Sequence, residues 1–453
     1  MTKYSILFLS LGLLLGTSCE KLVETESPYL DQDAYFQNEA EVLASLNEGY
    51  RILAFGEVMG GNTWLASELM ADNINGSNLS GDFKAYHTHN TGIFIGFTRG
   101  IWQQNFAAVG EINRLLAGKA NANLTQALDD EVTGSALFGR AFVHFAMVRL
   151  FAQPYGYTSD NSHLGIPYRD AWSVDPQPRL TVDEVYTKII DDLTTAIALL
   201  PSQSSISAAH ANRWAAKALL AQVYFQMNDY SNAHSLAQEI VDMGPYALVD
   251  SIGDRFDEMM TTEDILVQPD GGGFNSGANW QGHYRNDNGT PTIRMSESVY
   301  AEATANTLDL RGQQWFTESG NNIFLNKANG SNDLFHPVLH LTEVLLIKAE
   351  SAAILGLTAE AENDVNQIIV RAGMTPVSGL SSGDLISLIR TQRRLEMVGE
   401  GNRLHDLKRI AVSENQNLSI NGAPWDCPGM VVQFPDDELN GNPGMPANEE
   451  GGC

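Results

Sequence analysis

The stretch from residue 214 to residue 245 constrains the fold of this chain more than any other. Two apolar runs with helical spacing are separated there by the turn Asn228-Asp229-Tyr230. Ala221 in the first run and Ala233 in the second are small, so two antiparallel helices can approach closely. Such a pair cannot bury its apolar face alone. The sequence therefore predicts that further helix pairs stack against it.

The same stretch fits the tetratricopeptide pattern, a helix-turn-helix repeat of about 34 residues. Counted from Trp214, five positions carry the leucine, small residue, tyrosine, alanine and proline of that pattern: Leu220, Ala221, Tyr224, Ala233 and Pro245. Lys217 and Ala237 depart from it, so the unit is degenerate. Ala349 and Ala361 repeat the spacing of the two alanines, with Leu355-Gly356-Leu357 as their turn.

Two further helix pairs are predicted, each interrupted by an insertion. Residues 131–151 pair with 182–200, and residues 39–53 pair with 100–116. The predicted fold class is mostly α, with degenerate tetratricopeptide-like helix pairs that form a superhelical scaffold, long irregular loop insertions and few short strands. We expect these units near 39–116, 131–200, 214–247 and 341–373, in a single body from 34 to 453 that ends in a tail at 413–453.

Two long segments, 56–96 and 250–335, interrupt the predicted helices, and the second shows neither a helical nor a strand period clearly. The first is rich in glycine and asparagine, and the second combines runs such as Gly271-Gly272-Gly273 with scattered aromatic residues. Long irregular segments of a compact protein are usually functional. We therefore expect ligand contacts in these two segments.

The first eighteen residues are typical of a bacterial export signal. Lys3 supplies the positive start, and the apolar run 6–15 is too short to span a bilayer. Small residues lead into Cys19, which we expect to be lipidated after cleavage, with residues 19–33 as a flexible tether. Gly16 departs from the leucine that lipoprotein signals more often carry there, and the alternative is an ordinary secretory signal. The rest of the chain is expected to be soluble and tethered to the membrane.

The charge of the chain limits which partners it can bind, and its cysteine content indicates the compartment in which it folds. The chain has 27 basic and 55 acidic residues and a net charge of −28, so nucleic acid is excluded as a partner by electrostatic repulsion. If Cys19 carries lipid, Cys427 and Cys453 remain as a pair in an oxidising compartment. We predict a disulfide between them. The alternative is a buried thiol at Cys427 and a frayed terminus at Cys453.

Candidate catalytic groups are few. Glu396 and Glu400 could form a carboxylate pair for acid–base chemistry. Arg393, Arg403 and Asp406 stand at helical spacings nearby, which favours a ladder of structural ion pairs instead.

His87-Thr88-His89 offers two imidazoles, but no third ligand stands at a metal-site spacing, so a solvated loop is expected. No Gly-x-x-x-x-Gly-Lys phosphate loop is present. We expect no catalytic residue, no metal and no cofactor, and no enzymatic activity.

Two sets of residues suit sugar capture, which needs aromatic faces for pyranose rings and polar groups for hydroxyls. One set lies in the second segment: Phe274, Asn279, Trp280, Tyr284 and Arg285. The other lies in the first: Asn75, Asn78, Phe83, Tyr86 and His87. The alternative for each aromatic residue is a role in a small core that pins the loop.

Several motifs resemble those of the RagB/SusD nutrient-uptake family, and the resemblance extends over nearly the whole chain after the signal. They are Gly165-Ile166-Pro167, Arg179-Leu180-Thr181-Val182-Asp183-Glu184-Val185-Tyr186, Asp191-Asp192-Leu193, Arg393-Arg394-Leu395-Glu396, Glu400-Gly401-Asn402-Arg403, Asp406-Leu407, Phe434-Pro435, Glu438 and Asn442-Pro443-Gly444-Met445.

The resemblance implies a lipoprotein on the outward face of the outer membrane. It implies that the protein sits as a lid on a SusC-type TonB-dependent barrel transporter, binds oligosaccharides or in some members peptides, and delivers them. Peptide capture in the same role is therefore one alternative. A helical-repeat scaffold that binds only protein is another, although the two long insertions count against it. Substrate identity does not follow from a family signature.

Overall fold

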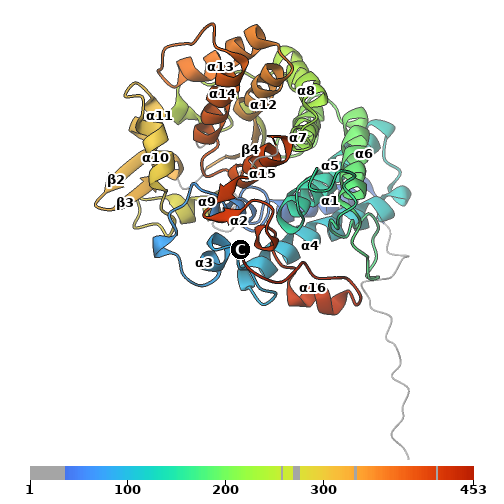
Figure 1. Ribbon diagram of the computed structural model, residues 1–453. Coiled ribbons are helices and arrows are strands. Elements are labelled where there is room, and N and C mark those ends of the chain that lie inside the picture. The colour runs from blue at the N-terminus through green and yellow to red at the C-terminus, as the bar shows by residue number, and fades with distance from the viewer. Residues whose placement is uncertain (1–35, 257–258, 269–275, 331–333, 415–416) are drawn as a thin grey trace, which may run out of the picture.

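Pairs of helices make up most of the computed structural model, which describes residues 36–256, 259–268, 276–330, 334–414 and 417–453 (Figure 1). The α-helices are α1 (Glu39–Leu53), α2 (Asn62–Met70), α3 (Gly81–His87), α4 (Gly96–Gly118), α5 (Gln126–Phe151), α6 (Val182–Leu199), α7 (Arg213–Gln226), α8 (Tyr230–Met243), α9 (Ser276–Tyr284), α10 (Glu297–Thr304), α11 (Leu310–Gln314), α12 (Leu341–Ile354), α13 (Thr358–Arg371), α14 (Ser382–Glu396), α15 (Arg403–Glu414) and α16 (Asp436–Gly441). Short 3₁₀ helices are η1 (Gly76–Asn78), η2 (Lys119–Ala122), η3 (Ile252–Arg255), η4 (Asn326–Ala328) and η5 (Pro428–Met430).

Four helix pairs pack as the sequence predicts: α1 with α4, α5 with α6, α7 with α8, and α12 with α13. The mostly α, tetratricopeptide-like fold class is confirmed. α5 begins at Gln126, five residues before the predicted start, because the Thr125 side chain caps it by accepting from the Leu128 N–H. α4 likewise begins at Gly96 rather than at residue 100.

Local signals set the helix boundaries within these pairs. Asp229 caps α8 by accepting from the Asn232 N–H at 3.1 Å. Thr181 and Glu184 form a reciprocal capping box at the start of α6. Gly356, in the turn between α12 and α13, has a φ of +82°, which glycine adopts without strain.

A close approach of three helices fixes the first half of the molecule. At Gly139 on α5, an added Cβ would lie 2.9 Å from the Ile112 side chain on α4 and 3.1 Å from the Leu53 side chain on α1. Only a residue without a side chain allows this contact. Gly139 therefore brings the first two helix pairs together.

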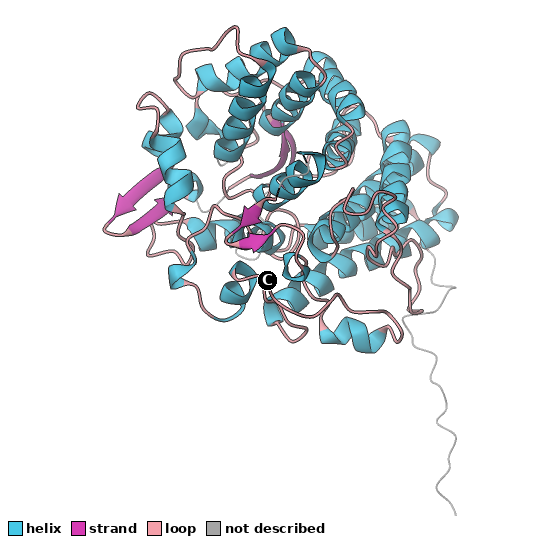
Figure 2. Cartoon of the chain, in the orientation of Figure 1, coloured by secondary structure: helices cyan, strands magenta, loops and turns pink. Residues whose placement is uncertain are grey.

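In the part of the chain that the structure describes, the strands form three two-stranded antiparallel ribbons (Figure 2). They pair β1 (Asp264–Gln268) with β4 (His336–His340), β2 (Phe316–Ser319) with β3 (Asn322–Leu325), and β5 (Ser419–Ile420) with β6 (Ala423–Pro424). The expectation that 250–335 lacks regular structure is therefore wrong, because short helices and strands occupy much of it. The partner of β1 is β4, which is remote in sequence, so a local period could not reveal that pairing. β2 and β3 instead form a local hairpin, which the sequence pattern did not identify.

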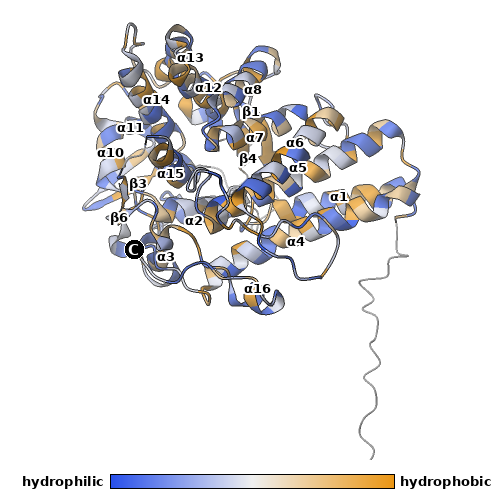
Figure 3. Cartoon of the chain, turned by 45° about the vertical axis from the view of Figure 1, so that its right-hand side comes forward, coloured by the Kyte–Doolittle hydropathy of each residue, from blue (hydrophilic) through white to orange (hydrophobic). Residues whose placement is uncertain are grey.

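The main core combines buried residues from both halves of the chain. Every residue of β1 and of β4 is buried, and Figure 3 shows hydrophobic residues on β1 and along α1. Within the described ranges, no helix is both long enough and apolar enough to cross a membrane.

The C-terminal tail is packed into this core. Phe434 is fully buried, with its ring centre 5.1 Å from that of Trp102 and 5.4 Å from that of Phe151. The Val432 N–H donates to the Leu150 carbonyl at 2.9 Å. The apolar residues of the tail supply this packing although the segment has little regular structure.

Candidate functional site

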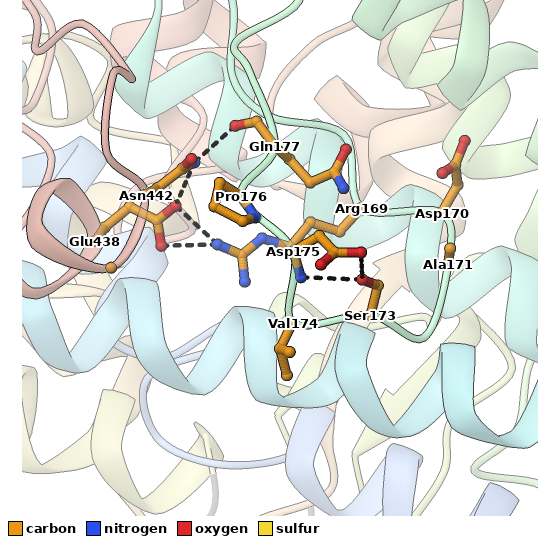
Figure 4. Close-up of a pocket in the computed structure, with 11 residues that line it drawn as sticks. Arg169, Asp170, Ala171, Ser173, Val174, Asp175, Pro176, Gln177, Glu438 and Asn442 are labelled. Atoms are coloured by element: carbon orange, nitrogen blue, oxygen red, sulfur yellow. Dashed lines mark hydrogen bonds and ion pairs between the residues drawn. The ribbon is translucent and has the colours of Figure 1, made fainter. Parts of the chain in front are cut away.

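A polar pocket of about 300 Å³ lies between the segment that joins α5 to α6 and the short helix α16 (Figure 4). Residues 169–177, Trp172 excepted, form one wall, and Glu438, Gly441 and Asn442 form the other. Small-molecule sites span roughly 300–1,000 Å³. The pocket therefore has room for a small ligand.

An ion pair between Arg169 and Glu438 joins the two walls. Arg169 Nη2 donates to both carboxylate oxygens of Glu438, at 2.7 Å each. The indole N–H of Trp102 on α4 donates to the same carboxylate at 2.9 Å. The Arg169 guanidinium also lies 4.8 Å from the centre of the Phe106 ring. These contacts fix α16 against α4.

Asn442 makes a second connection between the walls. Its Nδ2 donates to the Gln177 carbonyl at 2.6 Å and to Glu438 Oε1 at 3.3 Å. Figure 4 shows both contacts at one side of the pocket. The C-terminal wall is thus positioned by hydrogen bonds to side chain and backbone of the opposite wall and not by packing alone.

Buried side chains of α4 and α5 hold the backbone of the 169–177 wall. Asn113 Nδ2 donates to the carbonyl oxygens of Arg169 and Ala171, at 3.0 and 3.3 Å. Arg140 Nη1 donates to the Asp170 carbonyl at 3.2 Å. These donors satisfy carbonyl groups that a helix or strand would otherwise satisfy. An irregular segment is thereby kept in one conformation.

His144 on α5 provides a further anchor. Its Nε2 accepts from the Arg169 backbone N–H at 3.0 Å, and its Nδ1 lies 2.8 Å from the Arg140 carbonyl oxygen. Because a carbonyl can only accept, Nδ1 carries the proton. Burial lowers the pKa of His144 to about 3. The imidazole is therefore neutral near pH 7 and retains its acceptor nitrogen.

Arg140 is held in turn by α6. Its guanidinium donates twice to the Asp192 carboxylate, at 2.7 Å each. The Tyr168 hydroxyl donates to Asp192 at 2.6 Å, and the Tyr168 ring stacks on His144 with centres 3.8 Å apart. The wall of the pocket is therefore supported by a buried polar network from three helices.

Polar groups of this wall remain open to a ligand. Ser173 Oγ donates to Asp175 Oδ2 at 2.7 Å. Within the described residues, Asp175 Oδ1 and the side-chain amide of Gln177 have no partner. Lys188 donates to Asp170 at 2.7 Å. Burial by itself would raise the pKa of the Asp170 carboxyl. The hydrogen bond from Lys188 and the positive charges of Lys188 and Arg140 outweigh burial, so the pKa of Asp170 is lowered.

Trp280 and Tyr284 lie on α9 and not on an irregular loop as predicted. Each is 1% exposed. The Trp280 ring centre lies 5.3 Å from that of Phe256, 5.5 Å from that of His336 and 5.9 Å from that of Tyr284. Protein side chains therefore cover both rings. Their contact with a ligand stays a prediction.

The aromatic residues of the first insertion pack similarly. Tyr86 is fully buried, and its hydroxyl lies 2.7 Å from Thr98 Oγ1. Phe83 is half-buried, with its ring centre 5.6 Å from that of His283 on α9. The structure thus brings the first insertion and α9, the two predicted ligand regions, into contact. Asn75 is half-buried and accepts from the Ser77 N–H at 2.9 Å.

The remaining predicted ligand residues have different positions. The Asn279 side chain lies against Gly56, where an added Cβ would approach it to 3.0 Å. Arg285 is half-buried and forms an ion pair with Asp287. Asn78 is exposed in η1. Phe274 lies outside the described residues.

The expectation of a solvated loop at His87-Thr88-His89 is wrong. His87 Nδ1 lies 3.1 Å from the Leu69 carbonyl oxygen, and His89, which is buried, has Nε2 2.8 Å from the Met70 carbonyl oxygen. Both imidazoles therefore contact backbone carbonyl groups at the C-terminal end of α2. In the part of the chain that the structure describes, no group of three or more histidine, cysteine or carboxylate side chains could hold a metal ion.

Glu396 and Glu400 are buried and structural, but the predicted partners are wrong. Glu396 accepts from Arg311 at 3.0 Å and from Arg371 at 2.7 Å. Glu400 stands in the turn after α14, where it contacts Arg255 at 3.1 Å and pairs with Lys327. Burial by itself would raise the pKa of both carboxyl groups. The surrounding cations outweigh burial, so they lower the pKa of Glu396 and hold the pKa of Glu400 well below its usual value. Both carboxylates therefore remain ionised.

The neighbouring residues of the expected ladder have other partners. Arg393 donates to Asp406 at 2.8 Å and to Glu343 at 2.9 Å. Arg403 donates to Asp72 at 2.7 and 2.9 Å. These pairs connect α14 and α15 to α12 and to the turn after α2, so sequence spacing identified their structural role but not most of their contacts.

A Gly-x-Ser-x-Gly match, Gly379-Leu380-Ser381-Ser382-Gly383, is a helix cap and not a nucleophile elbow. Ser381 Oγ accepts from the Asp384 N–H at 3.2 Å and donates to the Asp384 carboxylate at 2.6 Å. The serine therefore begins α14, as expected of an N-cap.

The predicted disulfide between Cys427 and Cys453 is confirmed, with their Cα atoms 5.8 Å apart. It closes the tail that contains α16. Cys19, the predicted lipidation site, lies outside the described residues, as do the signal and the whole tether.

Sequence reasoning missed the pocket itself. Arg169 and Glu438 are 269 positions apart, and no local pattern joins them. The motif residues Glu438 and Asn442 were noticeable, as was the proline-rich character of the segment around Pro176. Only the fold shows that these two features face each other.

Two family models match the chain. A SusD-like model described as "Starch-binding associating with outer membrane" matches residues 28–225. The model described as "SusD family" matches residues 212–445, more than half of the chain.

Individual relatives agree with these matches. SusD-like protein P2 of Formosa agariphila is 25% identical over 481 residues, which cover 93% of each chain. A solved SusD superfamily protein from Bacteroides vulgatus has a TM-score of 0.79 at 22% identity, over 91% of this chain and 99% of that one. A structure described as a laminarin-binding SusD-like protein has a TM-score of 0.70 at 20% identity, over 91% and 99%. At such identities the two structures establish the shared fold.

Proposed function

This chain belongs to the SusD family, and on that premise we propose that it captures oligosaccharide at the cell surface and delivers it to a SusC-type TonB-dependent transporter, on which it sits as a lid. The observation that carries the proposal is the SusD family match over residues 212–445. The match to a starch-binding, outer-membrane-associated model over residues 28–225 supports it.

The proposal includes a lipid anchor on the outward face of the outer membrane. Its support is the export signal at residues 1–18, which ends at Cys19, and the polar stretch 19–33 that follows. In this arrangement the lipid on Cys19 holds the protein at the membrane while the tether allows the folded body to move over the transporter.

A glycan is the proposed ligand because polar groups with mixed donor and acceptor character line the pocket beside α16. A related structure described as laminarin-binding gives further support. Four of the residues predicted from the sequence have partly exposed side chains and stay in the proposed ligand surface: Phe83, Asn75, Asn279 and Arg285. The buried residues Trp280, Tyr284 and Tyr86 could touch a ligand only if the protein opens.

The proposed role is binding without catalysis. Glu396 and Glu400, the strongest candidates for acid–base chemistry, are fully buried and engaged by cationic side chains. A general acid must exchange a proton with its substrate and titrate near the working pH. Neither carboxylate meets these requirements.

A binding screen of the purified full chain tests the ligand class. Calorimetry against neutral oligosaccharides, acidic oligosaccharides and peptides should detect an oligosaccharide. Binding to peptides alone would replace the glycan with a peptide ligand. Binding to neither class would favour a scaffold that recognises only protein.

The transporter partnership has a separate test. Mild detergent extracts of the native membrane, captured through this protein, should contain a large outer-membrane barrel protein. Extraction of the protein alone, while a known membrane complex from the same extract stays intact, would contradict the lid role.

A further inference from the structure

We propose that the pocket between residues 169–177 and α16 binds one neutral, hydroxyl-rich unit of the ligand, such as a single unmodified sugar ring, and rejects carboxylated or sulfated units. This inference rests on the proposed glycan-binding function and adds the size and charge of the bound unit. The lining contains no residue of α3 or α9, so the pocket is separate from the aromatic residues predicted from the sequence.

The size of the pocket limits the ligand. Its volume of about 300 Å³ is at the lower end of the range for small-molecule sites. Figures 1 and 3 both place α16 at the edge of the molecule below α4 and away from the β2–β3 hairpin. One small ring at the surface, with the rest of a chain extending into solvent, suits this arrangement.

The walls are organised before any ligand arrives. Asn113, Arg140 and His144 are buried and hold the backbone at residues 169–171. Because these anchors are in place, and Asn442 donates to the Gln177 carbonyl at the other end of the wall, binding does not have to order either end of the wall. The conformational entropy cost that weakens many loop sites is therefore small here.

Hydrogen-bonding character favours hydroxyl groups. The Asp175 carboxylate accepts, the Gln177 amide both donates and accepts, and a hydroxyl can satisfy either role. An apolar ligand would bury these groups without partners, at a cost in free energy. Val174, which is 77% exposed, and Pro176 offer small apolar surfaces for the C–H groups of a ring. None of the described residues that line the pocket is aromatic, so hydrogen bonds and not stacking must hold the ring.

Charge excludes anionic units. Among the described residues, the lining contains three carboxylates, those of Asp170, Asp175 and Glu438, and one guanidinium, that of Arg169. Lys188, which pairs with Asp170, adds one further positive charge. The three carboxylates and the two cations together leave a net charge of −1. An added carboxylate or sulfate would meet like charge within the pocket, which costs free energy in a partly desolvated site.

Monosaccharide probes can test the inference on the purified full chain. Saturation-transfer NMR should detect binding of neutral glucose, galactose, mannose or xylose, and no binding of glucuronate, galacturonate or glucose 6-sulfate. Trp172 lies within the lining segment and is half-buried, so its fluorescence should respond to the sugars that bind. Replacement of Trp172 by phenylalanine identifies this signal among those of the other tryptophans.

Variants of exposed residues connect the binding to the pocket. Asp175→Ala removes a charged acceptor and should weaken binding of the neutral sugar about tenfold. Val174→Trp fills the pocket and should abolish it. Val370→Trp is the matched control, because Val370 is also exposed, at 55%, but lies on α13. Asp175→Asn, which removes the charge and keeps the size, should reduce the discrimination against uronates.

Three outcomes would overturn the inference: no neutral monosaccharide binds, uronates bind as well as neutral sugars, or Val174→Trp and Asp175→Ala bind like the wild type. Oligosaccharide binding by the wild-type chain separates this failure from that of the proposed function. If oligosaccharide binds equally to the wild type and to Val174→Trp, the proposed function stands and the pocket is not the site. If the wild type binds no oligosaccharide, the proposed function itself fails.

Discussion

The indole N–H of Trp280 donates to the backbone carbonyl of Gly399 across 2.7 Å. This hydrogen bond joins α9 to the turn between α14 and α15, where Gly399 has a φ of +82°. An added Cβ at Gly399 would lie 2.9 Å from the Leu325 side chain and 3.7 Å from the indole nitrogen. Trp280 is therefore an internal connection between distant parts of the chain.

Replacement of Trp280 by alanine should lower the free energy of unfolding by roughly 3–5 kcal/mol, because it empties a large buried volume and removes a hydrogen bond. Urea unfolding of the variant and the wild type measures the change. Trp280→Phe should lose less because it fills part of the space. An alanine variant with unchanged stability and lost glycan binding would instead show that Trp280 acts on the ligand.

Gly399→Ala should destabilise the protein more than the same substitution at Gly379. Both glycines have positive φ, +82° and +69°, so both variants bear the cost of a left-handed alanine. An added Cβ at Gly399 also meets the Leu325 side chain, whereas no described residue lies within 4 Å of an added Cβ at Gly379. The difference between the two melting temperatures isolates the contact. Equal losses would mean that Leu325 moves aside freely.

The helix pairs could be predicted because their signals are local. The helical period, the turn at Asn228-Asp229-Tyr230 and the spacing of Ala221 and Ala233 all lie within one short stretch. α1 has the predicted bounds for the same reason. α9, at nine residues, is too short for its period to be distinguished from that of a loop with aromatic residues.

The candidate site could not be predicted because its contacts are remote in sequence. For Glu396, local spacing suggested Arg393, whereas the structure supplies Arg311 and Arg371 from other elements. Arg169 and Glu438 form an ion pair although 269 positions of sequence separate them. Buried ion pairs of this kind depend on which elements the fold brings together, and a single sequence gives no ranking of the possible partners.

The stability of the wild type should fall between pH 5 and pH 8 through the titration of Glu68. This side chain is fully buried on α2, where burial raises the pKa of its carboxyl from 4.5 to about 7. The folded state therefore holds the proton more tightly than the unfolded state does. Its stabilising contribution is complete below the unfolded pKa and is lost as the pH rises through the folded pKa.

Urea unfolding of the wild type and Glu68→Gln at both pH values measures this effect. The stability of the wild type relative to the variant should fall by about 2–3 kcal/mol from pH 5 to pH 8. Glu318→Gln, at an exposed position on β2, controls for the general effect of removing a carboxylate. A relative stability of Glu68→Gln that does not vary with pH would contradict the raised pKa.

Cys19 should carry lipid in cells. The chain has three cysteines, and the other two form a disulfide. Labelled fatty acid should therefore enter the wild type and not Cys19→Ala, and the variant should leave the membrane fraction. Incorporation of label into both proteins would show that the small residues before Cys19 are not a lipoprotein cleavage site.

Cys453→Ser should lower the free energy of unfolding without releasing the tail from the body. The disulfide closes a sequence separation of 26 residues, which in the chain-entropy model stabilises the folded state by roughly 3 kcal/mol. The tail stays docked because the Phe434 ring remains buried between Trp102 and Phe151. Urea unfolding should show the loss, and limited proteolysis should leave the tail uncut at pH 7.

Cys427→Ser should have the same effect, because either change opens the same loop. Thiol titration of the denatured, unreduced wild type supplies the decisive measurement: it should find no free cysteine when Cys19 is lipidated, and two reactive thiols would mean that packing alone holds the tail.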